Sequence, residues 1–425
     1  MSTVFSVSPA RSTAPVSAVE GLRIAQTVLL ISLIAFVPSF TSYLFETSSH
    51  AAGTAVVTVL VLLLLLRQLK ISRLVPLCVG LGVVIVAHLL AASLFGPVQF
   101  GRALLSLLLL GLVFAAASCV GPQIFRLPNR VIEPAIMIMR ALMLLIGVAG
   151  ALRVQPPVVA VQILGFQIGG IHWEKSVFPF TEPSHFALAF VPLLIDACVR
   201  SAGIKRYLWL VIGLALGYFL QNLTLIVGVV LAAGLSLPIA GLAAGAVAFA
   251  AAVASVDVAY FSDRLDFSLE TSNLSSLIYI QGWQLMVDAF HRTSGWGLGF
   301  QQLGLGAVNS AAADTIFRLY RFELNLQDGG FTFAKVVGEF GVLGAILVLV
   351  YIGLAIKLAL RLRRISKYPA AYPSGATYAY AVVLSFSIDL FVRGVGYFNG
   401  SALLLFSALY YYWTTMAPSR KGAGQ

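Results

Sequence analysis

Long apolar runs separated by short polar connections dominate this chain. Runs of roughly 17 to 25 apolar residues can cross the hydrocarbon layer of a bilayer as helices, because a helix satisfies its own backbone polar groups. Two connections are much longer than the others, at 153–183 and 257–330. The pattern predicts an all-α, polytopic membrane helix bundle with about twelve transmembrane helices, at 22–43, 52–66, 74–95, 102–120, 132–152, 184–199, 207–220, 224–237, 239–256, 331–358, 376–397 and 401–415.

Composition supports the same class. Of 425 residues, 60% are hydrophobic and only 10% are charged, which leaves too little polar surface for a soluble globule. The first 21 residues are rich in Ser, Ala and Pro and are expected to be a disordered cytoplasmic tail. We therefore expect a single transmembrane domain over 22–416, followed by a short cytoplasmic tail at 417–425.

Basic residues give the expected orientation. Lys and Arg concentrate in the short connections that follow alternate spans, and such connections face the cytoplasm. Both termini are then cytoplasmic, and the two long connections lie outside. This depends on a break between two helices at Gln221 and Asn222, because one continuous helix would place the basic run 357–367 outside. The net charge of +11 is explained by these connections, so nucleic acid is not expected as a partner.

The first long connection ends in a polar cluster. Glu182, Pro183 and Ser184 form a helix-start arrangement, and helix capping alone could explain them. The same region also contains His172, Lys175 and His185, more polar groups than a cap needs. Such a cluster suits removal of a proton from a hydroxyl, with Glu182 or His185 as the base.

Cations on the outer side depart from the charge trend. A guanidinium binds phosphate oxygens with a planar fork and keeps its proton, so a group of arginines suits a pyrophosphate. The alternative is that each one pairs with a nearby acid. The candidate residues are Arg153, Arg292, Arg318, Arg321 and Arg393, with Lys175, Lys335 and His172 beside them.

Charged residues within spans are costly unless they face a cavity or one another. Lys335 and Glu339 are four residues apart, as are Asp389 and Arg393, and both pairs are expected to be self-paired or functional. His88 is expected to be a buried helix contact. Two further pairs are expected to be structural, Glu133 with Arg140 and Asp196 with Arg200.

The second long connection contains two expected helices. One covers 275–291, and the other covers 313–322, where Asp314, Arg318 and Arg321 would share one face. Between them, the alternating glycines of 295–300 permit a tight backbone that packs at an interface. No preceding strand supports a nucleotide-binding motif there, and no metal or nucleophile motif is present. We expect a reaction that needs neither metal nor cofactor.

Three segments resemble a known family. They are Phe-Thr-Glu-Pro-Ser-His-Phe-Ala at 180–187, Gly-Trp-Gly-Leu-Gly-Phe at 295–300 and Gly-Glu-Phe-Gly-Val-Leu-Gly at 338–344. In this order the segments resemble Wzy-type polysaccharide polymerases and the related O-antigen ligases, most of all the polymerases of xanthan-type exopolysaccharide. The likeness covers roughly 130–415.

The resemblance implies a glycosyltransferase of the bacterial inner membrane that acts on its periplasmic face. Such enzymes join oligosaccharide repeat units carried on undecaprenyl pyrophosphate. The expected partners are this lipid-linked substrate, the membrane lipid around the protein, and chain-length or export proteins of the same pathway. Glu182 would be the base, with His185 second. Arg318 and Arg321 would lead the pyrophosphate ligands, followed by Arg153, Arg292 and Arg393.

Three alternatives stay open. A ligase would move the glycan to a different lipid acceptor and rely on a loop histidine, for which His291 is available in the second long connection. A flippase or transporter of lipid-linked oligosaccharide would place polar residues through the centres of many spans, where few are found. A structural partner in an export complex would need no reactive site.

Overall fold

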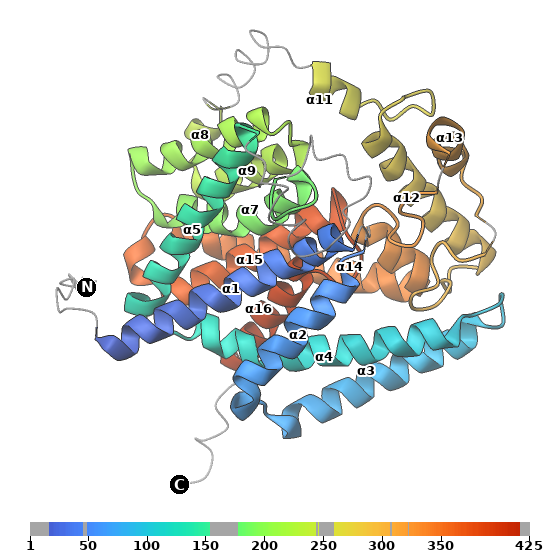
Figure 1. Ribbon diagram of the computed structural model, residues 1–425, viewed down its shortest axis with the longest axis horizontal. Helices are drawn as coiled ribbons and strands as arrows, with labels where there is room; N and C mark the ends of the chain where they lie inside the picture. Colours follow the sequence, from blue (N-terminus) through green and yellow to red (C-terminus); the bar gives the residue numbers. More distant parts are fainter. Residues whose placement is uncertain are drawn as a thin grey trace, which may run out of the picture.

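The computed structural model describes residues 17–45, 49–153, 177–243, 245, 259–306, 308–321 and 323–416. In these ranges the regular secondary structure is helical, with no β-strand (Figure 1). The main helices are α1 (Ala18–Leu44), α2 (Ala51–Leu65), α3 (Ile71–Ala92), α4 (Phe100–Phe125), α5 (Asn129–Ala151), α7 (Pro183–Arg200), α8 (Ile204–Phe219), α9 (Leu223–Ser236), α11 (Ala259–Arg264), α12 (Leu274–Arg292), α13 (Ala311–Tyr320), α14 (Thr332–Ile365), α15 (Ser374–Phe391) and α16 (Gly400–Met416).

The predicted all-α polytopic membrane class is confirmed. Eight of the described helices are long and apolar enough to span a membrane. Helices α8, α9 and α16 are shorter but coincide with three further expected spans. Most of the expected span 239–256 lies outside the described residues. The separate helices α8 and α9 confirm the predicted break, where Gln221 has a φ of 50° and the Asn222 side chain accepts a hydrogen bond from the Leu225 N–H at 3.1 Å.

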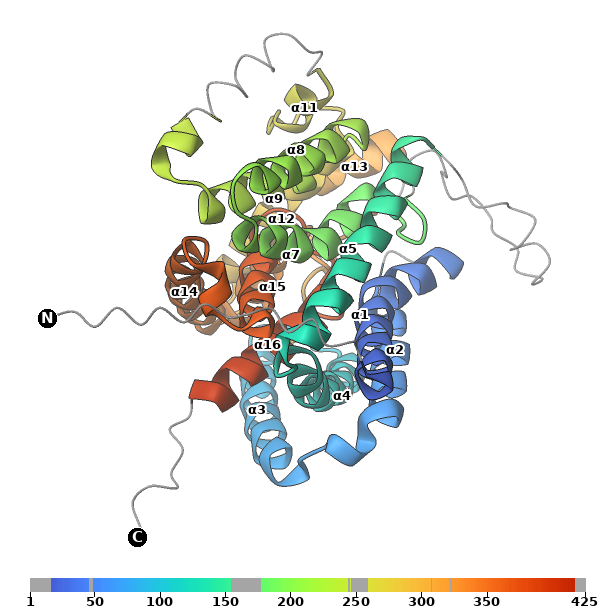
Figure 2. The same cartoon turned by 90° about the vertical axis from the view of Figure 1, so that its left-hand side faces the viewer.

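Helices α7 and α15 form the centre of the bundle. More than three quarters of the residues in each are buried, against fewer than half in the other long apolar helices. Phe186 and Phe190 of α7 stack on one another, with ring centroids 5.5 Å apart. Figures 1 and 2 show the remaining long helices arranged around these two. Residues at the ends of α7 and α15 are therefore held by the most rigid part of the molecule.

The helix ends divide into two sets. At one, here called the basic end, short connections contact one another: Ser374 N–H donates to Asn129 at 2.9 Å, and Arg206 donates to the Ser366 carbonyl at 2.7 Å. The opposite helix ends are called the loop end. Helices α12 and α13 lie on that side of the molecule (right in Figure 1). This alternation agrees with the span order expected from the sequence.

The segment 295–300, here called the glycine loop, packs against α14 at the loop end. Helix α14 kinks at Gly341, where φ is 57° and ψ is −131°. The loop pairs with this kink, because Leu298 N–H donates to Gly338 at 3.0 Å and Val342 N–H donates to Gly295 at 2.9 Å. A Cβ on Gly341 would lie 2.0 Å from the Gly295 carbonyl oxygen. The predicted tight packing of 295–300 at an interface is confirmed.

Candidate functional site

Glu182 occupies the start of α7 but does not cap it. It is the N-cap residue, followed by Pro183 at the first helical position, yet its side chain makes no capping hydrogen bond. Its Oε2 instead accepts hydrogen bonds from Ser184 Oγ and from Arg393 Nη2, each at 2.9 Å. Simple capping therefore does not account for this carboxylate, which is turned toward the end of α15.

The ion pair with Arg393 governs the charge of Glu182. The Arg393 guanidinium lowers the pKa of the Glu182 carboxyl to about 2, although the partial burial of this half-exposed side chain acts in the opposite direction. Such a carboxylate is ionised at neutral pH and is a weak proton acceptor. Glu182 can act as an efficient base only after Arg393 has moved to another anion.

A cavity of about 380 Å³ surrounds this ion pair, and we call it the arginine cavity. Arg153 reaches it from the end of α5, Arg393 from the end of α15, and Arg264 from the end of α11. Asn222 and Tyr279 contribute polar groups to its wall. Three guanidinium groups and one carboxylate therefore meet at the loop end, where four separate helices bring them together.

His185 lies in a different, smaller space. A cavity of about 40 Å³, the histidine pocket, is lined by His50 and His185, whose rings are 4.5 Å apart. His185 Nδ1 is 2.7 Å from Thr181 Oγ1. Within the described part of the chain, Nε2 of neither histidine has a hydrogen-bond partner. Burial and the neighbouring His185 lower the pKa of His50 well below its usual range.

The cations predicted from the second long connection lie elsewhere. Arg318 and Arg321 are exposed and do not line the arginine cavity. Helix α13 ends at Tyr320, and Arg321 is its C-cap in the left-handed conformation, with a φ of 62°. The expectation that Asp314, Arg318 and Arg321 share one helix face is therefore wrong, because the backbone leaves the helix before Arg321.

Two other predicted ligands have intramolecular partners. Arg292 Nη2 is 2.6 Å from Asp288 Oδ2 within α12. Lys335 is buried, with Nζ 3.2 Å from Glu339 Oε1, so the predicted Lys335–Glu339 pair is confirmed. The Glu339 carboxylate also accepts from the Gln301 N–H at 2.8 Å and thereby anchors the glycine loop. His172 and Lys175 lie outside the described residues.

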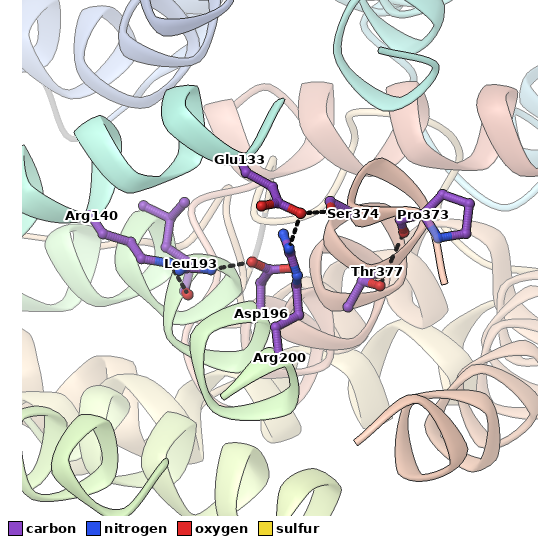
Figure 3. Close-up of polar contacts among 8 residues, drawn as sticks. All are labelled: Glu133, Arg140, Leu193, Asp196, Arg200, Pro373, Ser374 and Thr377. Atoms are coloured by element: carbon purple, nitrogen blue, oxygen red, sulfur yellow. Dashed lines mark hydrogen bonds and ion pairs between the residues drawn. The ribbon is translucent and has the colours of Figure 1, made fainter. Parts of the chain in front are cut away.

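Three expected charge pairs are wrong. Arg393 pairs with Glu182 rather than with Asp389, whose buried carboxylate accepts from Thr332 Oγ1 at 2.6 Å. Figure 3 shows the other correction: Arg140 pairs with Asp196, and Arg200 with Glu133, so both ion pairs join α5 to α7. The reason is that helix packing, rather than spacing within the chain, decides which charges meet.

The expectation for His88 is confirmed. It is buried, with Nε2 3.0 Å from the Trp296 carbonyl oxygen and its ring stacked on Trp296.

Sequence reasoning missed His50 and Arg264. His50 stands at the loop end of a span and is one of only five histidines, which was a usable signal. Arg264 lies among charged neighbours and carried no such signal.

A further cavity of about 800 Å³ lies at the loop end beside α2 and α4. Its charged lining residues are Arg102, Glu323 and Asp328. Two acids and one cation repel a pyrophosphate, so the smaller arginine cavity is the better candidate for an anionic substrate.

Comparison of the chain with known protein families, with curated proteins and with solved structures found no match.

Proposed function

We propose that this protein is a membrane glycosyltransferase that joins undecaprenyl-pyrophosphate-linked oligosaccharide repeats into a polysaccharide, with the donor's pyrophosphate in the arginine cavity. The observation that carries this proposal is the convergence of Arg153, Arg264 and Arg393 beside Glu182. Guanidinium groups are the preferred partners of phosphate oxygens, and a carboxylate within reach of the same anion can serve as a base. The proposal retains Arg153 and Arg393 as ligands and adds Arg264.

The placement of charge supports a site on the periplasmic face. The basic end carries many lysines and arginines in short connections, which favours the cytoplasmic side of the inner membrane. The arginine cavity is at the opposite end of the same helices. The head group of a polyprenyl pyrophosphate lies at the membrane surface, so a cavity next to the ends of α5, α7 and α15 is suitably placed for it.

The ion pair suggests how substrate binding would activate the base. A pyrophosphate carries more negative charge than one carboxylate and competes for Arg393. When Arg393 turns to the phosphate, the Glu182 pKa rises toward its ordinary value and the carboxylate can accept a proton. The acceptor hydroxyl gives its proton to Glu182 while its oxygen bonds to the anomeric carbon of the donor. The bond from that carbon to the phosphate oxygen breaks, and the lipid pyrophosphate leaves as an anion that the arginines stabilise.

Of the two predicted bases, the geometry favours Glu182. Its carboxylate lines the arginine cavity, whereas His185 lies in the histidine pocket behind it. His185 is close enough to influence the charge of Glu182, because it contributes to lowering the pKa of that carboxyl. We assign His185 a positioning role beside Thr181.

Deletion of the gene tests the proposed function in cells. Lipid-linked glycan is then extracted from the deletion strain and from a strain carrying the intact protein. Loss of polymer with single repeats retained on the lipid at the periplasmic face supports polymerisation. Repeats retained on the cytoplasmic face would indicate a flippase. Normal polymer that fails to reach a second lipid acceptor would indicate a ligase.

A further inference from the structure

A groove of about 710 Å³ lies at the basic end, the opposite end of α5, α7 and α8 from the arginine cavity. Arg140 of α5, Arg200 at the end of α7 and Lys205 of α8 line it, together with the ring of Trp209. Among the described residues that line this groove, none is acidic. We call it the Trp209 groove. Cations beside hydrocarbon are expensive unless an anion pairs with them, so the partners of these three decide what the groove can bind.

The two arginines are held in place from behind. Figure 3 shows Asp196 against Arg140 and Glu133 against Arg200. Glu133 is fixed in turn by Ser374, whose hydroxyl donates to it at 2.7 Å. Among the described residues, Arg200 donates to Glu133 through Nη2, and Arg200 also lines the groove. These acids fix the orientation of the guanidinium groups without occupying the groove.

Lys205 adds charge that the protein does not neutralise. It is exposed, and within the described part of the chain it has no ion pair. Helix α8 also begins at this edge, after Gly203, and no side chain caps its first turn. The positive end of a helix favours an anion at such a position. The groove therefore has two partly neutralised arginines, one unpaired lysine and a helix start.

The walls of the groove continue as apolar surface. Met137, Leu145 and Val211 are more than 60% exposed on α5 and α8. Figure 1 places these two helices at the edge of the bundle, where acyl chains would contact them. The Trp209 ring centroid lies 5.8 Å from the Arg140 guanidinium, a cation–π arrangement that adds an amphipathic ring to the lining of the groove.

From these contacts we propose that the Trp209 groove binds the head group of an anionic phospholipid, with its acyl chains along the exposed faces of α5 and α8. A cationic pocket between helices at the cytoplasmic side, next to an apolar wall, fits a phosphodiester that carries hydrocarbon chains. A free phosphate would satisfy the cations but would leave the apolar walls uncovered. The site is independent of the proposed glycosyltransferase activity.

The full-length protein in detergent tests this site by native mass spectrometry and by thermal unfolding. Phosphatidylglycerol is added, and phosphatidylcholine and inorganic phosphate serve as comparisons. The variants are Lys205→Gln and Trp209→Leu, because removal of Arg140 would orphan the buried Asp196 and removal of Arg200 would leave Glu133 without its cation. Lys367→Gln is the matched control, since Lys367 is also exposed at the basic end but lies outside the groove.

We expect the intact protein and Lys367→Gln to retain phosphatidylglycerol at least five-fold better than phosphatidylcholine. Lys205→Gln and Trp209→Leu should each lose most of this preference while their melting temperatures without lipid stay within a few degrees of the intact protein. Equal retention of both lipids by the intact protein overturns the proposal. So does stabilisation by inorganic phosphate alone as large as that by phosphatidylglycerol, or equal losses in Lys205→Gln and Lys367→Gln.

Discussion

Arg393 Nη2 lies 2.9 Å from Glu182 Oε2, which ties the end of α15 to the start of α7. The two residues are 211 positions apart, so this contact exists only in the folded chain. Both helices are the most buried of the bundle, and the pair forms where they reach the loop end. The pair therefore links the rigid centre of the fold to the wall of the arginine cavity.

Loss of Arg393 should abolish most activity. In the proposed reaction Arg393 stabilises the leaving pyrophosphate, and removal of one such group commonly costs about 100-fold or more in rate, so we expect a loss of that size in Arg393→Gln. Polymer yield in cells that produce equal amounts of inserted protein measures this. Arg318→Gln is the matched control, because Arg318 is an exposed arginine outside the cavity. A comparable loss in Arg318→Gln would place the pyrophosphate on α13 instead.

The Glu182–Arg393 pair should contribute a pH-dependent stability. Because the folded pKa of Glu182 is about 2, below its ordinary value, the contribution is complete above about pH 5 and is lost as the pH falls toward 2. Glu182 is half-exposed, so we expect about 1 kcal/mol or less. The difference in melting temperature between the intact protein and Glu182→Gln should be constant from pH 8 to pH 5 and shrink below. A difference that grows on acidification contradicts this account.

Replacement of Arg140 should lower the stability of the protein, because it leaves a buried carboxylate without its cation. Asp196 is fully buried, and Arg140→Met would remove its cation, a loss that costs about 3 to 5 kcal/mol at buried pairs. The double variant Arg140→Met with Asp196→Leu should recover most of that stability, because apolar replacements of both partners leave no buried charge. Thermal unfolding of the single and double variants measures this. A double variant as unstable as Arg140→Met would show that the loss comes from packing.

Alanine should destabilise α14 at Gly341, where the helix kinks, but not at Gly353. Gly341→Ala would place a methyl group 2.0 Å from the Gly295 carbonyl oxygen in a backbone region unfavourable to alanine, and should cost more than about 2 kcal/mol. Gly353→Ala in the same helix meets no atom within 4 Å and should be neutral or slightly stabilising. Thermal unfolding compares the two, and equal effects would show that the glycine loop does not depend on the kink.

The helices could be predicted because a membrane helix makes all its backbone hydrogen bonds internally. The length of an apolar run is therefore nearly sufficient to identify such a helix. The break at Gln221 and Asn222 was also predictable, since charge counting required it. The site was only partly predictable. The cluster that contains Glu182 was found, but spacing within the chain could not show that Arg393 turns toward it. Packing angles between helices, which no local pattern contains, decide such contacts.

The arginines of the second long connection show the same limit of prediction from sequence. Arg318 and Arg321 are prominent in the sequence because they recur at helical spacing, whereas Arg264 stands between Asp263 and Asp266. Arg318 on α13 and Arg321 just after it are exposed outside the cavity, whereas Arg264 at the end of α11 lines it. Which arginine reaches a cavity depends on where the connecting loops fold back.

Polymer formation by the purified protein in vesicles, supplied with undecaprenyl-pyrophosphate-linked repeat units, tests the central claim most directly. Products are separated by size on a gel. The account predicts a ladder of lengthened glycans with the intact protein and Arg318→Gln, and single repeats only with Glu182→Gln. An unchanged ladder with Glu182→Gln, or no ladder with the intact protein, would contradict it.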